Sequence, residues 1–106
     1  DPRNEDVNEI IIQMVKGALK TKALEFSSSQ LADLRKHVGR HWFIRIPERG
    51  EAISYAIQKL AKANDIVVVC GKGHEKSMSY NGIEYGWSDK EAVRIALRGG
   101  VKKIKR

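Results

Sequence analysis

Apolar residues recur at helical spacing in the first part of the chain. Between residues 5 and 19 they form one stripe with acidic residues at its start, which is the pattern of an amphipathic helix. Residues 20–28 lack such a pattern, and we expect a loop there. Ser28 or Ser29 stands as a cap before a second, shorter apolar stripe that stops at Gly39, so a short helix is predicted between them.

Two more helices are predicted in the second half of the chain. Pro47 opens a stretch with an apolar stripe at helical spacing, and Asn64 lies in the break that ends it. A capping box opens at Ser88, where a serine and a glutamate three positions later can satisfy each other's backbone amides. We expect the last helix to run from this box through Leu97, with Trp87 as a hydrophobic staple.

Two stretches near the third helix have the pattern of β-strands. Residues 41–46 alternate between two faces. The run Ile66–Cys70 is unbroken and mostly β-branched, which is typical of a strand that is buried on both faces and parallel to its neighbours. With the helix between them, residues 41–71 are predicted to form a βαβ unit with a right-handed crossover.

A β-hairpin is predicted after this unit. Residues 76–80 and 83–86 are extended stretches, and the Asn81-Gly82 pair between them is typical of a type I′ turn. The elements together predict an α/β protein with flanking helices. Because only two sheet strands are predicted besides the hairpin, we expect a partial Rossmann-like, doubly wound sheet.

Length and composition point to one soluble domain. The chain has 106 residues, of which 42% are hydrophobic and 31% charged, and we expect a single domain over residues 1–106. The longest apolar run is far shorter than the roughly 20 residues of a membrane span, and the acidic start is unlike a secretory signal. Cys70 is the only cysteine, so no internal disulfide can form. We therefore expect a cytoplasmic protein without a membrane partner.

The net charge of +7 suggests an anionic partner. Five positive charges lie near the end of the chain, at Arg98, Lys102, Lys103, Lys105 and Arg106. We expect residues 101–106 to be a solvated basic tail, with a phosphate-binding arm as the alternative. No aromatic residues interleave with the basic ones as they do on base-stacking surfaces. Because of the positive charge, a small module that binds nucleic acid or an acidic protein is kept as a second interpretation.

A first candidate site is the segment Gly71-Lys72-Gly73-His74-Glu75. It follows the predicted buried strand at its carboxyl end, where open α/β sheets bind their ligands. Its two glycines let the backbone approach a ligand, and a cation, an imidazole and a carboxylate lie within one turn. A plain turn with exposed polar residues is the alternative. The spacing of its glycines fits neither a P-loop nor a dinucleotide fingerprint.

A second candidate site lies at the start of the chain. Asp1, Pro2 and Arg3 form a rigid turn into the first predicted helix. An arginine beside a helix N-terminus is suited to hold a carboxylate in a bidentate manner. A surface salt bridge from Arg3 to Glu5 or Asp6 is the alternative, and these residues alone leave both open.

Four segments resemble, in the same order, motifs of the C-terminal domain of the Mur ligases. They are Asp1–Asp6, Ile46–Ile53, Gly71–Glu75 and Ser88–Glu91. The resemblance covers nearly the whole chain, and the first and third segments are its most specific parts. It is strongest to the branch that adds the third residue of the peptidoglycan stem peptide. It implies a Rossmann-like domain whose first strands are absent from this chain.

The resemblance implies an ATP-dependent amide ligase of peptidoglycan synthesis, with this chain as its amino-acid-binding domain. Such an enzyme adds a diamino acid to UDP-N-acetylmuramoyl-L-Ala-D-Glu through an acyl phosphate. In the family, ATP and Mg²⁺ bind to a central ATPase domain and the UDP-sugar to a first domain, which this chain lacks. We therefore expect the isolated chain to be inactive and to contain neither a catalytic residue nor a metal ligand.

The resemblance also implies roles for individual residues. Arg3 corresponds to the arginine that clamps the side-chain carboxylate of meso-diaminopimelate. Gly71, through its carbonyl, and Glu75 correspond to residues that contact the far amino and carboxylate end of that amino acid. A role in loop shape is expected for the residues between them, Lys72, Gly73 and His74. Asp1 stands where enzymes that use diaminopimelate usually have asparagine, so L-lysine or another amino acid remains the alternative substrate.

Overall fold

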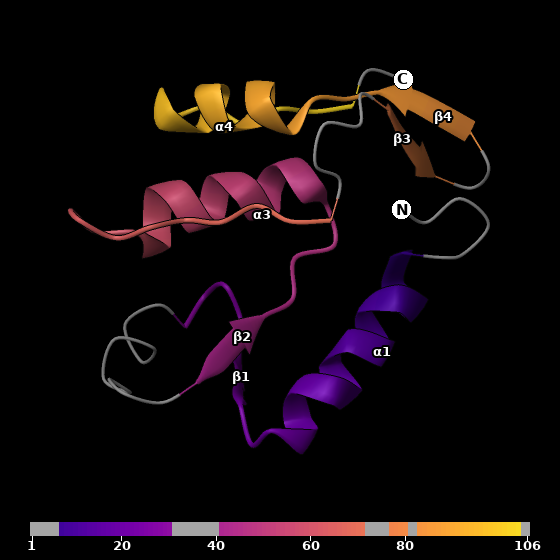
Figure 1. Ribbon diagram of the computed structural model, residues 1–106, viewed down its shortest axis with the longest axis vertical. Helices are drawn as coiled ribbons and strands as arrows, with labels where there is room; N and C mark the ends of the chain where they lie inside the picture. The colour runs from indigo at the N-terminus through magenta and orange to yellow at the C-terminus, as the bar shows by residue number, and fades with distance from the viewer. Residues whose placement is uncertain (1–6, 31–40, 72–76, 81–82, 105–106) are drawn as a thin grey trace.

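The computed structural model describes residues 7–30, 41–71, 77–80 and 83–104. They form an α/β arrangement of helices with two small two-stranded sheets (Figure 1), which confirms the expected mixed class. One sheet is the parallel pair β1–β2 and the other is the antiparallel pair β3–β4. A doubly wound sheet is not seen among these residues, and the short helix predicted before Gly39 falls on residues outside them.

The first helix, α1 (Val7–Lys20), confirms the helix predicted over residues 5–19. It buries Val15 and lines, with β2 (Trp42–Ile44) and the two residues after it, a cavity of about 260 Å³. β2 confirms the strand predicted over residues 41–46 and is shorter than expected. The apolar stripe of α1 therefore covers the first sheet only in part, since Ile12, Met14 and Leu19 are exposed.

The strand β1 (Leu24–Phe26) corrects the prediction of a loop over residues 20–28. It runs parallel to β2, with Leu24 opposite Trp42 and Phe26 opposite Ile44. Three residues are too few to show a period in the sequence, and their strand conformation depends on a partner far along the chain. A strand of this kind gives almost no local signal.

The helix α3 (Arg49–Tyr55) starts later than Pro47 because Glu48 is its cap. The Glu48 carboxylate accepts hydrogen bonds from the backbone N–H of Gly50 at 3.2 Å and of Glu51 at 2.9 Å. The helix continues as a π-helical turn, η1 (Ala56–Leu60), and the chain then turns where Asn64 has a φ of 72°. The predicted break of this helix is therefore confirmed.

The run Ile66–Cys70 departs most from its prediction. Among the described residues it pairs with no strand. Ile66 is 88% and Val68 74% exposed, while Val69 packs against the core. The βαβ unit predicted over residues 41–71 is therefore not formed in this structure, because Ile66–Cys70 is not a strand, and β2 pairs in parallel with β1. A β-branched run becomes a buried strand only where neighbouring strands supply hydrogen bonds and cover.

The predicted hairpin and last helix are confirmed. β3 (Ser77–Tyr80) pairs antiparallel with β4 (Ile83–Gly86), with Ser77 opposite Gly86. α4 (Asp89–Leu97) begins at its predicted cap, because the hydroxyl of Ser88 accepts a hydrogen bond from the N–H of Glu91 at 3.2 Å. No described helix is long and apolar enough to cross a bilayer.

The main core lies where α3, η1, α4 and the hairpin meet. Five buried residues form it: Ile53, Met78, Trp87, Ala92 and Ala96. The two alanines of α4 carry almost no side chain, so α4 can approach α3 closely. This core places the N-termini of both helices at the same end as the hairpin (Figure 1).

The described part of the basic tail, residues 101–104, lies against the core, with Val101 and Lys103 still exposed. Ile104 packs against the core cluster. The ammonium of Lys102 lies 5.6 Å from the centroid of the Trp87 ring and 3.0 Å from a carboxylate oxygen of Glu91. Residues 101–104 are therefore not the fully solvated tail that was predicted, because lysine stems cover apolar surface while their charged ends find partners.

Polar contacts fix the same segment from both sides. The Gly100 carbonyl accepts hydrogen bonds from the hydroxyl of Ser54 at 2.9 Å and from the amide of Gln58 at 2.8 Å. The ammonium of Lys103 donates to Glu51 at 2.7 Å, and this hydrogen bond raises the pKa of Lys103. Two cations of the tail are thus already paired within the chain.

Candidate functional site

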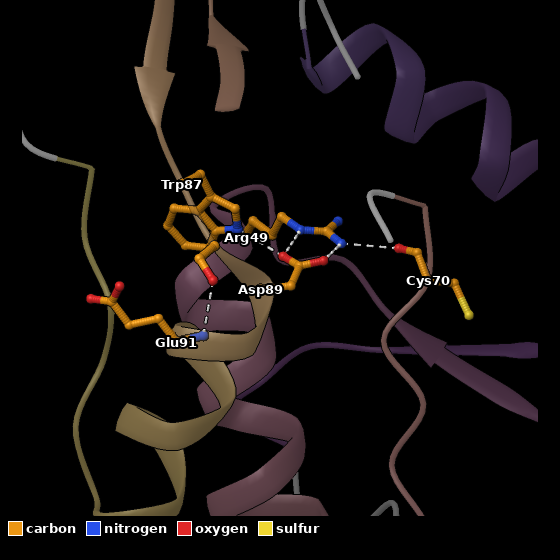
Figure 2. Close-up of polar contacts among 6 residues, drawn as sticks. Arg49, Cys70, Trp87, Asp89 and Glu91 are labelled. Atoms are coloured by element: carbon orange, nitrogen blue, oxygen red, sulfur yellow. Dashed lines mark hydrogen bonds and ion pairs between the residues drawn. The ribbon is translucent and has the colours of Figure 1, made fainter. Parts of the chain in front are cut away.

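Three segments meet where the predicted Gly71–Glu75 loop begins. The run through Cys70 reaches this point, and each of α3 and α4 presents its first residue there, Arg49 and Asp89 (Figure 2). The Arg49 Nε donates to Asp89 Oδ1 at 2.8 Å, and its Nη2 donates to Asp89 Oδ2 at 2.6 Å. This bidentate pair joins the two helix N-termini and is stronger than a single neutral hydrogen bond.

The carboxylate of Asp89 is held from a second direction by Trp87. The indole Nε1 donates to Asp89 Oδ1 at 2.7 Å, and the Trp87 side chain belongs to the core. Asp89 is only 8% exposed. A buried carboxylate is tolerated where it is paired and hydrogen-bonded, and this one has both kinds of partner. The geometry around Asp89 is therefore well determined.

Arg49 also reaches the chain that enters the loop. Its Nη2 donates to the backbone carbonyl of Cys70 at 3.0 Å. The next residue, Gly71, has a φ of 103°, which residues with a side chain rarely adopt. A Cβ added at Gly71 would meet nothing within 4 Å, so backbone conformation and not lack of space requires glycine here.

The helix N-termini at this site are already capped. The Glu48 carboxylate caps α3, and the Ser88 hydroxyl caps α4. An open helix N-terminus attracts phosphate, and these caps already occupy the backbone N–H groups of Gly50, Glu51 and Glu91. In the part of the chain that the structure describes, no three metal-binding side chains come together.

Most of the predicted site residues lie outside the described residues. These are Lys72, Gly73, His74 and Glu75 of the first candidate site and Asp1 and Arg3 of the second. Gly71 is described, and the structure places it next to Arg49 and the N-termini of α3 and α4. That the two predicted segments form one site stays a prediction.

Sequence reasoning missed Arg49, Trp87 and Asp89 as a unit. Each lies in or beside a recognised motif, but the first and last are far apart in the sequence and no local pattern joins them. The one available signal was that an arginine and an aspartate each lie in the first turn of a predicted helix. The pairing itself depends on how α3 and α4 pack.

A separate polar hollow of about 370 Å³ lies at the carboxyl ends of β1 and β2. Arg45, on its wall, donates from Nε to Glu25 at 2.5 Å and from Nη2 at 3.0 Å. The hydrogen bond to Glu25 raises the pKa of Arg45. Both side chains are substantially exposed, so this pair is a surface ion pair.

No protein-family model and no solved structure matches the chain. Curated relatives do match it. A UDP-N-acetylmuramyl-tripeptide synthetase of Borreliella afzelii is 38% identical over 97 residues, which are 92% of this chain and 16% of the relative. A UDP-N-acetylmuramoyl-L-alanyl-D-glutamate–2,6-diaminopimelate ligase of Phocaeicola vulgatus is 37% identical over 94 residues, which are 89% of this chain and 16% of the relative.

A third relative gives the same result. The UDP-N-acetylmuramoyl-L-alanyl-D-glutamate–2,6-diaminopimelate ligase of Pseudomonas aeruginosa is 36% identical over 74 residues, which are 69% of this chain and 15% of the relative. The expected resemblance to the Mur ligases is thereby confirmed. The chain spans 15 to 16% of the length of these three relatives, and by this similarity it belongs to the Mur ligase family.

Proposed function

We propose that the chain is the C-terminal, amino-acid-binding domain of a ligase that acts in peptidoglycan precursor synthesis in the cytoplasm. The observation that carries this proposal is the similarity, over 92% of the chain, to a tripeptide synthetase. The ligase would join the amine of a diamino acid to UDP-N-acetylmuramoyl-L-Ala-D-Glu. Because the chain belongs to the Mur ligase family, ATP and Mg²⁺ are assigned to a central ATPase domain outside this chain, and the isolated chain is expected to be inactive.

The geometry at Gly71 supports a ligand site in the loop that follows it. The chain enters this loop through a backbone carbonyl held by Arg49, beside the capped starts of two helices. A binding segment that starts from such a fixed point loses less conformational entropy when it binds a ligand. Gly71 and Glu75 are proposed to bind the amino and carboxylate end of the amino acid, with Lys72, Gly73 and His74 shaping the loop.

For the substrate we propose meso-diaminopimelate, clamped at its side-chain carboxylate by Arg3, with Asp1 beside it. Two of the relatives carry 2,6-diaminopimelate in their names. L-Lysine lacks the second carboxylate that an arginine clamp would bind, so Arg3 favours the diacid. The nucleic-acid-binding alternative has less support, because Lys102 and Lys103 are paired with acidic residues of the same chain.

The experiment uses the full-length protein that contains this chain. It is incubated with UDP-N-acetylmuramoyl-L-Ala-D-Glu, ATP, Mg²⁺ and either meso-diaminopimelate or L-lysine, and the UDP-tripeptide is measured by mass spectrometry. We expect product with diaminopimelate. Arg3→Ala and Glu75→Ala should each lower kcat/KM for diaminopimelate about 10- to 100-fold, the range for losing a hydrogen-bonded charge partner. The matched control is Lys16→Ala, which removes an exposed cation from α1.

Each negative result has a distinct meaning. A folded full-length protein that makes no tripeptide with any amino acid would contradict the proposed function. A preference for L-lysine would place the protein in the lysine-adding branch. If Arg3→Ala kept the wild-type selectivity for diaminopimelate, the clamp would be wrong while the ligase assignment stood.

A further inference from the structure

We propose that Arg49 and Asp89 are positioning residues that set the backbone orientation of Gly71 and so control affinity for the amino acid substrate. This inference rests on the proposed function for its kinetic consequence. Its structural part stands on the contacts from Arg49 to Asp89 and to the Cys70 carbonyl alone. Neither residue is proposed to touch the substrate.

The first step is the peptide bond between Cys70 and Gly71. A peptide unit is planar, so the Cys70 carbonyl and the Gly71 N–H turn together. The hydrogen bond from Arg49 Nη2 to the Cys70 carbonyl, at 3.0 Å, therefore orients this whole plane. The Gly71 carbonyl, which is proposed to contact the amino acid, is separated from the fixed plane by only the two torsions of Gly71.

The second step is the freedom of Gly71. Glycine has the widest range of backbone conformations, and Gly71 adopts a φ of 103°. Ile66–Cys70 pairs with no strand among the described residues, so no ladder of backbone hydrogen bonds orients the chain before the glycine. The contact with Arg49 is thus a specific restraint at the point where the loop begins.

The third step is the rigidity of Arg49 itself. Its guanidinium is held in a fork by both oxygens of Asp89, and Asp89 is held by the indole of Trp87 in the core. The direction of Nη2 toward Cys70 is therefore determined by packing that is continuous with the core (Figure 2). A lysine at position 49 keeps the positive charge but not the fork, so it cannot reproduce both contacts.

The test uses full-length protein and the variants Arg49→Lys and Asp89→Asn. The matched control is Arg45→Lys, because Arg45 makes a similar bidentate pair with Glu25 and no recorded contact with Cys70 or Gly71. The readouts are KM for diaminopimelate, ATP and the UDP-dipeptide, kcat, the melting temperature, and hydrogen exchange of the segment containing Gly71. The exchange measurement needs no substrate.

In Arg49→Lys and Asp89→Asn we expect KM for diaminopimelate to rise about tenfold, equivalent to about 1.4 kcal/mol. KM for ATP and for the UDP-dipeptide should stay within about twofold of wild type. Exchange at the Gly71 segment should become faster in both variants. Arg45→Lys should change none of these quantities.

Two results would overturn the inference. One is an unchanged KM for diaminopimelate with unchanged exchange in Arg49→Lys and Asp89→Asn. The other is a parallel rise of all three KM values together with a lower melting temperature, which would indicate a general structural defect. If the wild-type protein makes no tripeptide at all, the proposed function fails. Comparing hydrogen exchange at the Gly71 segment in Arg49→Lys and Arg45→Lys then still decides whether Arg49 restrains the Cys70–Gly71 peptide.

Discussion

A single methyl group at Gly50 tests how closely the tail packs on the core. Gly50 is the second residue of α3 and is buried. A Cβ built on it would lie 1.9 Å from the carbonyl oxygen and 3.0 Å from the carbonyl carbon of Lys102, and 3.2 Å from a ring carbon of Trp87. Since the two closest atoms belong to the backbone, no side-chain rotation can relieve the clash. Gly50→Ala must displace residues 101–104 from α3.

The magnitude follows from two opposing terms. Replacing glycine by alanine inside a helix stabilises a protein by about 0.5–1 kcal/mol when nothing is in the way. Overpacking a filled site costs about 1–3 kcal/mol, and here it also loosens Ile104 and Lys102 from the core cluster. The second term is larger, so we expect Gly50→Ala to lower the free energy of unfolding by about 1–2 kcal/mol.

Urea denaturation followed by tryptophan fluorescence is the assay, because Trp87 lies in the affected core. The matched control is Gly17→Ala in α1, where an added Cβ would meet nothing within 4 Å. There the helix term acts alone, and the free energy of unfolding should rise by about 0.5–1 kcal/mol. The same substitution in two helices should thus move the midpoint in opposite directions.

A shortened chain that ends at Gly100 separates the clash from other effects. Without residues 101–104, the methyl group at position 50 no longer meets Lys102, so Gly50→Ala should become neutral or stabilising. If Gly50→Ala stabilised the intact chain as much as Gly17→Ala does, the tail would not lie on α3. The reasoning from the packing of Lys102 would then be refuted.

Two further predictions concern the run after η1 and the cap of α4, and the same urea assay measures both. Ile66→Thr should change the free energy of unfolding by less than about 0.5 kcal/mol because Ile66 is 88% exposed, whereas Ile53→Ala should cost about 2–5 kcal/mol because Ile53 belongs to the core. Equal losses would instead mean that the run is buried. Ser88→Ala should cost about 1 kcal/mol because the hydroxyl caps the N–H of Glu91, while Ser88→Gly should cost only a few tenths, and equal stability of Ser88→Ala and wild type would contradict the cap.

The elements that the sequence predicted well are those with a local signal. α1 and α4 follow from apolar spacing and, for α4, from the serine cap, and the hairpin follows from its Asn-Gly turn. All of these signals act between residues a few positions apart. These signals do not depend on contacts with distant parts of the chain.

The errors all concern contacts between distant segments. β1 has too few residues to be seen without its partner β2. The β-branched composition of Ile66–Cys70 indicates a strand, but burial depends on neighbouring strands, and among the described residues none covers Ile66 or Val68. The basic composition of the tail predicted exposure to solvent. The contact of Lys102 with the ring of Trp87 could not be predicted from charge alone.

The candidate site shows the same division. The glycine at position 71 and its place after an apolar run could be read from the sequence, but the pair of Arg49 and Asp89 could not, since it forms only when α3 and α4 pack together. The geometry of this site is determined by the hydrogen bonds that Arg49 and Asp89 make. Truncating either partner to alanine leaves the other polar group without its partner in a partly buried setting. Arg49→Lys and Asp89→Asn keep a polar side chain at each position, so they are milder tests.

The exposed run Ile66–Cys70 is the reason why we expect the single hydrogen bond from Arg49 to matter at Gly71. In a paired strand, ladder hydrogen bonds on both sides orient each peptide, and one side-chain contact adds little. Here the segment before the glycine is held by the packing of Val69 on the core and by the bond from Arg49 to the Cys70 carbonyl. Apolar packing restrains position but is not directional, whereas the hydrogen bond is directional. The orientation of the Cys70–Gly71 peptide is therefore expected to depend on Arg49, whereas its position depends on the packing of Val69.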